Sequence, residues 1–92
     1  MTSEKLVKEA LKKYLKSIGA YYYMPVSLGY GSTSIDFFVC HKGRFYGIET
    51  KRYTVVEPTL RQAFVLRQIA SAGGGVWVEN SIGLEATKGV LK

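Results

Sequence analysis

Cysteine and histidine are nearly absent from this 92-residue chain, which contains one residue of each. The single cysteine, Cys40, cannot form an intramolecular disulfide, and its position in an apolar stretch predicts a buried thiol in a reducing compartment. Together with His41, which we expect in an exposed turn, it supplies too few ligands for a Cys/His zinc site in a monomer. Folds held together by disulfides or by such a zinc site are therefore excluded for a monomer.

Long apolar segments are also lacking, and none of the apolar runs is long enough to span a membrane. The charged N-terminal segment is not followed by the apolar stretch of a signal peptide, so we expect a cytoplasmic protein with no membrane partner. Gly29-Tyr30-Gly31 is too short for a Walker loop and lacks its lysine, and we expect no organic cofactor. Hydrophobic residues make up 47% of the chain, which predicts one globular domain over residues 1–92.

Acidic residues are scarce relative to basic ones, with seven Asp and Glu against thirteen Lys and Arg, which gives a net charge of +6. This excess favours a polyanionic partner, although a basic surface also occurs in soluble proteins without one. Basic residues gather in the first segment and after residue 50, and they could equally form solvated faces. We identify four candidate nucleic-acid-binding residues among them: Lys8, Lys12, Arg52 and Arg61.

Hydrophobic periodicity predicts the order helix, three strands, helix, strand and a short final helix. The helices are expected over residues 3–18, 58–72 and 85–91, and the strands over residues 20–26, 34–40, 44–51 and 76–78. The crossover through the second helix should be right-handed, which predicts an α/β fold with a mixed sheet flanked by helices. In that helix, Leu60, Phe64 and Ile69 are expected to face the sheet.

Asp36, Glu49 and Lys51 lie within predicted strands, among aromatic and β-branched residues. Charges there are costly unless they are paired, and strand alternation places Glu49 and Lys51 on one face. Two carboxylates and a lysine at strand ends suit a divalent metal and the phosphate on which it acts. Alternatively, the acids limit aggregation at a sheet edge and Lys51 is only their ion-pair partner. We favour the functional interpretation because both acids occur together with Lys51 and Gln62.

The order and spacing of several motifs resemble the VRR-NUC family of the PD-(D/E)xK nuclease superfamily, in particular its stand-alone viral members. The resemblance covers nearly the whole chain, and its most specific part is an Asp thirteen residues before the E-x-K triplet, followed by the Pro-Thr-x-x-Gln helix start. The matching segments are Gly19–Tyr22, Gly29–Gly31, Ile35–Phe37, Gly43–Phe45, Ile48–Lys51, Pro58–Gln62 and Ala72–Gly74. Ile35 stands where the superfamily name has proline, which affects entry into the strand more than the chemistry.

The resemblance implies a restriction-endonuclease-like fold and a role for each matching residue. Asp36 and Glu49 would bind Mg²⁺ or Mn²⁺, and the carbonyl of Thr50 would complete part of the metal shell. Lys51 would orient or help to deprotonate the attacking water, or stabilise charge on the phosphate.

Two further roles depend on the resemblance. Gln62 would support the same site. The acid that the superfamily carries on its first helix corresponds to Glu4, with Glu9 as the alternative, and it would be a further metal ligand.

The implied function is a metal-dependent DNA endonuclease that acts as a homodimer on branched DNA such as four-way junctions, in the cytoplasm of a host cell. Two alternatives remain: a catalytically silent nucleic-acid-binding module with the same fold, and a nuclease for flaps, nicks or single strands. The consecutive tyrosines at positions 21–23 alternate along a strand. At least one should lie in the core, and an exposed one could stack on an unpaired base or fill a dimer interface.

Overall fold

The computed structural model describes residues 3–26 and 34–92, so the predicted glycine loop at residues 29–31 lies outside the described residues. The elements are α1 (Glu4–Ser17), β1 (Tyr21–Tyr23), β2 (Phe37–His41), β3 (Arg44–Thr50), α2 (Leu60–Ser71), β4 (Gly75–Glu79) and α3 (Glu85–Lys88). The order of helices and strands is therefore the predicted one. None of the helices in the described residues is long and apolar enough to cross a membrane.

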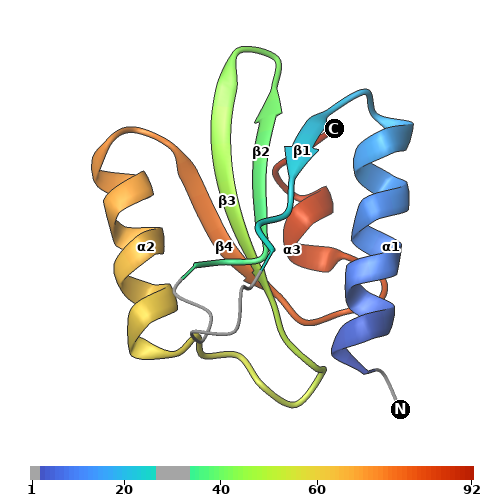
Figure 1. Ribbon diagram of the computed structural model, residues 1–92. Coiled ribbons are helices and arrows are strands. Elements are labelled where there is room, and N and C mark those ends of the chain that lie inside the picture. Colours follow the sequence, from blue (N-terminus) through green and yellow to red (C-terminus); the bar gives the residue numbers. More distant parts are fainter. Residues whose placement is uncertain (1–2, 27–33) are drawn as a thin grey trace.

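The four strands form one mixed sheet in the order β1-β2-β3-β4 (Figure 1). β1, β2 and β3 are antiparallel neighbours, whereas β4 runs parallel to β3 after the crossover through α2. Helix α1 and the C-terminal segment pack on one face, where the core contains Leu11, Phe37, Ile48 and Leu91. Helix α2 lies on the other face, and this arrangement confirms the predicted mixed sheet flanked by helices.

Helix α2 approaches the sheet closely because glycines lie beneath Ile69. A Cβ atom at Gly47 would lie 2.6 Å from Ile69 Cδ1, and one at Gly74 would lie 2.6 Å from Ile69 Cγ2. The expected inward position of Ile69 is consistent with these contacts. The same expectation for Leu60 and Phe64 is wrong, because their side chains are 92% and 58% exposed.

The buried residue Leu66 marks the inner face of α2 and explains this error. Phe64 precedes Leu66 by two positions, which is a rotation of about 200° around a helix with 3.6 residues per turn. Its ring is therefore carried to the outer surface.

Strand alternation also corrects the expectations for Cys40 and His41. Phe37, Val39 and His41 point into the core, whereas Cys40 lies on the opposite face and is exposed. His41 is 7% exposed, and its Nε2 atom lies 3.1 Å from the carbonyl oxygen of Lys92. The docked C-terminal segment covers His41, and sequence periodicity alone could not reveal that contact.

Candidate active site

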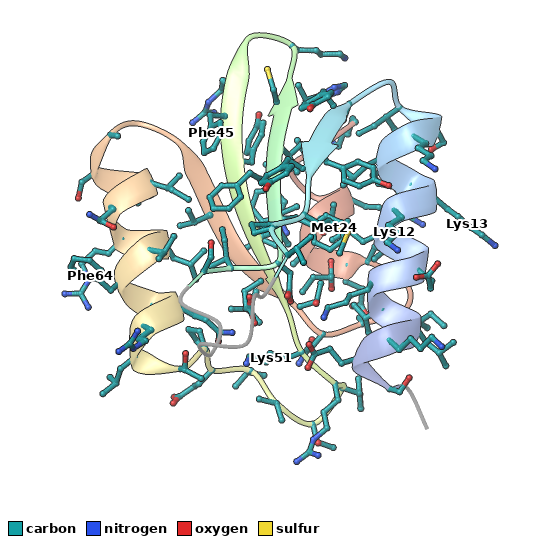
Figure 2. The ribbon with its side chains drawn as sticks, in the orientation of Figure 1. Lys12, Lys13, Met24, Phe45, Lys51 and Phe64 are labelled. Carbon is teal, nitrogen blue, oxygen red and sulfur yellow. The ribbon has the colours of Figure 1, made fainter. Side chains whose placement is uncertain are left out.

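The two strand carboxylates meet at one end of the sheet. Asp36 immediately precedes β2, and Glu49 is the penultimate residue of β3. In the antiparallel register Phe37 pairs with Ile48, so the residues next to this pair, Asp36 and Glu49, are neighbours. Lys51 follows β3 at the same end, as Figure 2 shows.

The carboxylate of Asp36 is held in place by Thr50. The backbone N–H and the hydroxyl of Thr50 both donate to Asp36 Oδ2, at 3.1 Å and 2.6 Å. The backbone N–H of Asp36 donates to Glu49 Oε1 at 3.1 Å. These bonds fix the two acids relative to each other, and they direct the other Asp36 oxygen, Oδ1, away from Thr50.

Glu49 is a buried acid whose charge is incompletely balanced. Its side chain is 1% exposed, and its Oε2 atom lies 3.4 Å from Lys51 Nζ. Burial, followed by the negative charge of Asp36, raises the pKa of Glu49 to about 7, while Lys51 opposes the shift. A carboxylate with this surplus of negative charge nearby favours an additional cation.

Lys8 of α1 brings a positive charge to the same place. Its Nζ atom lies 3.2 Å from Glu4 Oε2 and 3.4 Å from Asp36 Oδ1, so it bridges the two carboxylates. Partial burial lowers the pKa of Lys8, but the charges of Asp36 and Glu4 more than offset this and raise it overall. The structure thus places Glu4 beside Asp36, whereas Glu9 pairs with Lys12 at 3.0 Å on an exposed part of α1.

The whole chain can be superposed on a known fold. A solved structure described as a VRR_NUC domain matches with a TM-score of 0.79 and 19% sequence identity, and the match covers 100% of both chains. The chain has the VRR_NUC fold. No protein-family model and no curated protein matches the sequence, so the structural likeness establishes the fold, and the expected fold class is confirmed.

The residues at this end of the VRR_NUC fold fit a divalent ion by their chemistry. Glu4, Asp36 and Glu49 supply the hard oxygen donors that Mg²⁺ and Mn²⁺ prefer. The Thr50 N–H faces Asp36, and in an extended strand the carbonyl of the same residue points to the same side. In the part of the chain that the structure describes, however, no three His, Cys, Asp or Glu side chains converge as a metal-binding group. Lys8 lies between Glu4 and Asp36 and pairs with both carboxylates.

Gln62 is the third residue of α2 and belongs to its capping box. Its Oε1 atom accepts a bond from the Thr59 N–H at 2.9 Å, and its own N–H donates to Thr59 Oγ1 at 3.2 Å. These bonds hold the Gln62 side chain in the N-terminal cap of α2. Its expected support of the acidic site stays a prediction. Arg52 and Arg61, two candidate DNA-binding residues, are exposed.

Sequence reasoning missed the bridging position of Lys8 and the hydroxyl bond of Thr50. We considered Lys8 only as a DNA-binding residue and Thr50 only for its carbonyl. The spacing of Glu4 and Lys8 by one helical turn was the available signal, because residues four apart face each other on a helix.

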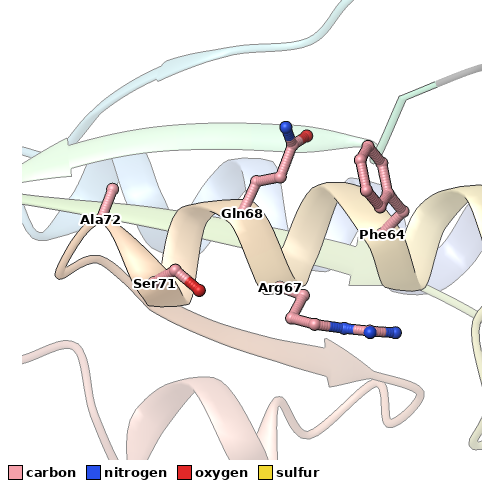
Figure 3. Close-up of a pocket in the computed structure, with 5 residues that line it drawn as sticks. All are labelled: Phe64, Arg67, Gln68, Ser71 and Ala72. Atoms are coloured by element: carbon pink, nitrogen blue, oxygen red, sulfur yellow. The ribbon is translucent and has the colours of Figure 1, made fainter.

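An open hollow of about 540 Å³ lies elsewhere in the molecule, along α2. Figure 3 shows its lining residues Phe64, Arg67, Gln68, Ser71 and Ala72, which all belong to α2 or its end. None of the candidate acids lines this hollow. The candidate active site is therefore separate from it, at the end of the sheet.

Proposed function

We propose that the protein is a VRR-NUC-type nuclease that hydrolyses DNA phosphodiester bonds internally and depends on Mg²⁺ or Mn²⁺. The observation that supports this most directly is the convergence of Asp36, Glu49 and Lys51 at one end of the sheet, with Glu4 approaching from α1. Carboxylates beside a lysine suit a divalent metal and a phosphate, and the net charge of +6 favours a polyanionic substrate.

Each residue has a distinct part in this proposal. Glu4, Asp36, Glu49 and the Thr50 carbonyl would hold the metal, which supplies polarisation of the phosphate and activation of water. Lys51 orients the attacking water, assists its deprotonation or stabilises charge on the phosphate.

The proposed substrate is branched DNA, such as a four-way junction, and the proposed active form is a homodimer. A 92-residue chain has little surface with which to contact a branched substrate by itself. Two copies related by a twofold axis would match the symmetry of a junction. The proposed location is the cytoplasm of the cell in which the protein acts.

The first test is cleavage of a labelled DNA panel by the purified protein. The panel contains a four-way junction, a flap, a nicked duplex, a plain duplex and a single strand, each with Mg²⁺, Mn²⁺ or EDTA. We expect metal-dependent cuts placed symmetrically on the junction. Cleavage of another form would retain the chemistry and change the substrate.

The variants Asp36→Asn, Glu49→Gln and Lys51→Ala should each abolish cleavage while the protein remains folded and retains much of its DNA binding. The matched pair Glu4→Gln and Glu9→Gln tests which first-helix acid takes part, because only Glu4 lies beside Asp36 through Lys8. We expect a loss of cleavage for Glu4→Gln only. Full activity in the Asp36 or Glu49 variant would disprove the assignment of the site.

A catalytically silent DNA-binding module is the second candidate, and the exposed basic residues favour it as much as they favour the nuclease. It predicts tight, metal-independent binding and no cleavage of any DNA form. The same panel therefore separates the two candidates.

A further inference from the structure

The segment that follows β3 is attached to the end of β4. β3 ends at Thr50, and the next residue, Lys51, donates its backbone N–H to the carbonyl oxygen of Glu79 at 3.0 Å. This bond extends the parallel pairing of Thr50 with Glu79. From there the chain turns toward α2 (Figure 1). The end of β4 therefore fixes the backbone of Lys51, the candidate catalytic lysine.

A turn follows Lys51 directly. The Val55 N–H donates to the carbonyl oxygen of Arg52 at 2.9 Å and closes it. The side chains of Arg52, Tyr53 and Thr54 are exposed, so packing contributes little to holding this turn in place. Polar contacts with the rest of the protein are therefore decisive for its position.

The side chain of Asn80, the residue after β4, makes such contacts. Its Nδ2 atom donates to the carbonyl oxygens of Tyr53 and Val55, at 3.0 Å each. A carboxamide nitrogen has two hydrogens, and both are used here. A carboxylate oxygen in the same place would face two carbonyl oxygens and repel them. The turn therefore requires the amide group of Asn80 and not only its shape.

The end of β4 is itself anchored in the protein interior by Glu79, which is 1% exposed. Its Oε1 atom accepts bonds from the N–H and the hydroxyl of Thr87 in α3, at 2.9 Å and 2.7 Å. Its Oε2 atom accepts a bond from the Ser81 N–H at 3.2 Å. Residues 79–81 are thus tied to α3, and they form a fixed support for the turn and for Lys51.

The backbone position of Lys51 matters for the candidate active site. Lys51 Nζ lies 3.4 Å from Glu49 Oε2, and the lysine side chain is 15% exposed. Because a lysine side chain is a flexible four-carbon chain, its ammonium group keeps a defined place only if its backbone is held. A displacement of about 1 Å in a catalytic group can lower the rate of a reaction about 100-fold.

We infer that Asn80 is a positioning residue of the proposed nuclease: its amide holds the turn after Lys51 and thereby keeps the Lys51 ammonium group beside Glu49. The inference rests on the proposed function and deepens it, because it adds a residue that lies outside the acidic site. In this role Asn80 acts through Lys51 and does not contact the substrate.

The test combines cleavage kinetics with amide hydrogen exchange. Asn80→Ala removes the amide, and Asn80→Asp keeps its shape but replaces the donating nitrogen by an accepting oxygen. Ser81→Ala is the matched control, because the Ser81 hydroxyl contacts Gly83 and Glu85 and not the turn. Cleavage is measured with Mg²⁺ on the DNA form that the wild type cuts. Exchange of the Lys51 and Val55 amides is followed by NMR in EDTA.

We expect both Asn80 variants to lower kcat about tenfold, with unchanged KM and unchanged DNA affinity in EDTA, because Lys51 acts in the chemical step. The Lys51 and Val55 amides should exchange about tenfold faster, whereas amides in the middle of β3 should exchange as they do in the wild type. Ser81→Ala should change neither kcat nor the exchange of these two amides.

Four results would overturn the inference. A normal kcat in both Asn80 variants would limit Asn80 to holding the turn, and unchanged exchange of the Lys51 and Val55 amides would remove its action on Lys51. A raised KM with normal kcat would assign the turn to DNA binding. An equal loss of kcat in Ser81→Ala would mean that any loosening of residues 79–81 impairs the site.

In each of these cases the wild type still cleaves DNA, so the proposed function stands and only the role of Asn80 is lost. Absence of cleavage by the wild type on every DNA form would instead overturn the proposed function, and this inference with it.

Discussion

At the residue scale, Glu49 is the residue of the candidate site whose ionisation is made unfavourable by its surroundings. Its carboxylate is almost completely buried and lies near Asp36, and the single ion pair with Lys51 does not compensate for both effects. A protein optimised only for stability would gain by replacing such an acid with a neutral residue. In a site that binds a divalent cation, the buried acid has a function, because the bound cation compensates for the unfavourable burial of its negative charge.

The raised pKa of Glu49 predicts how the stability of the protein depends on pH in the absence of metal. The folded pKa of Glu49 is about 7, above its ordinary value of 4.5, so the folded state holds this proton more tightly than the unfolded state does. The contribution of Glu49 to stability is therefore fully present below pH 4.5 and is lost as pH rises toward 7. We expect a loss of about 3 kcal/mol between pH 5 and pH 8, measured by urea unfolding in EDTA.

The Glu49→Gln variant is the control, because it cannot titrate at this position. The difference in unfolding free energy between the variant and the wild type should grow in favour of the variant as pH rises. An equal difference at both pH values would show that Glu49 is not perturbed.

At the scale of elements, α2 shows where sequence patterns suffice and where they fail. The Pro-Thr-x-x-Gln motif marks the helix start, because a threonine and a glutamine three residues later form a capping box. The inward face was assigned wrongly for Leu60 and Phe64, since apolar residues lie on both sides of this helix. The strands were predicted from alternation, but His41 and Cys40 were assigned incorrectly because burial depends on which distant segment covers each face. The acidic pair was predictable from its strand positions, whereas the Lys8 bridge needed the tertiary placement of α1.

The capping box also gives a test of Gln62. Gln62→Ala should lower the unfolding free energy by about 1 kcal/mol, because the Thr59 N–H loses its acceptor. Gln62→Glu retains an acceptor and should preserve stability. The measurement is urea unfolding of both variants.

Thr59→Ala is the matched control, since it breaks the same capping box from the other residue. If cleavage per folded molecule falls in Gln62→Ala but not in Thr59→Ala, Gln62 also supports the active site. Equal activity in the two variants would limit Gln62 to its structural role.

At the scale of the whole molecule, the distribution of positive charge decides how DNA is held. Binding to phosphates releases counterions, so the logarithm of the binding constant falls with the logarithm of salt concentration by about 0.7 to 0.9 per contact. The candidate contacts differ in their surroundings. Lys12 pairs with Glu9, Arg52 and Arg61 are exposed, and Lys8 lies between carboxylates. The salt slope therefore reports which of these residues contact phosphate and which pair only with carboxylates of the protein.

We expect Arg52→Ala and Arg61→Ala each to reduce the salt slope of junction binding by the amount that corresponds to about one phosphate contact. Lys12→Ala should have the same effect if Lys12 contacts phosphate in place of Glu9. Lys13→Ala is the control for Lys12→Ala, because both residues belong to α1 and Figure 2 shows Lys13 pointing away from the sheet. Binding is measured in EDTA over a range of salt concentrations. An unchanged slope in the two arginine variants would mean that these residues form a solvated surface. DNA would then have to be held by other charges, because a net charge of +6 attracts a polyanion without specifying where it binds.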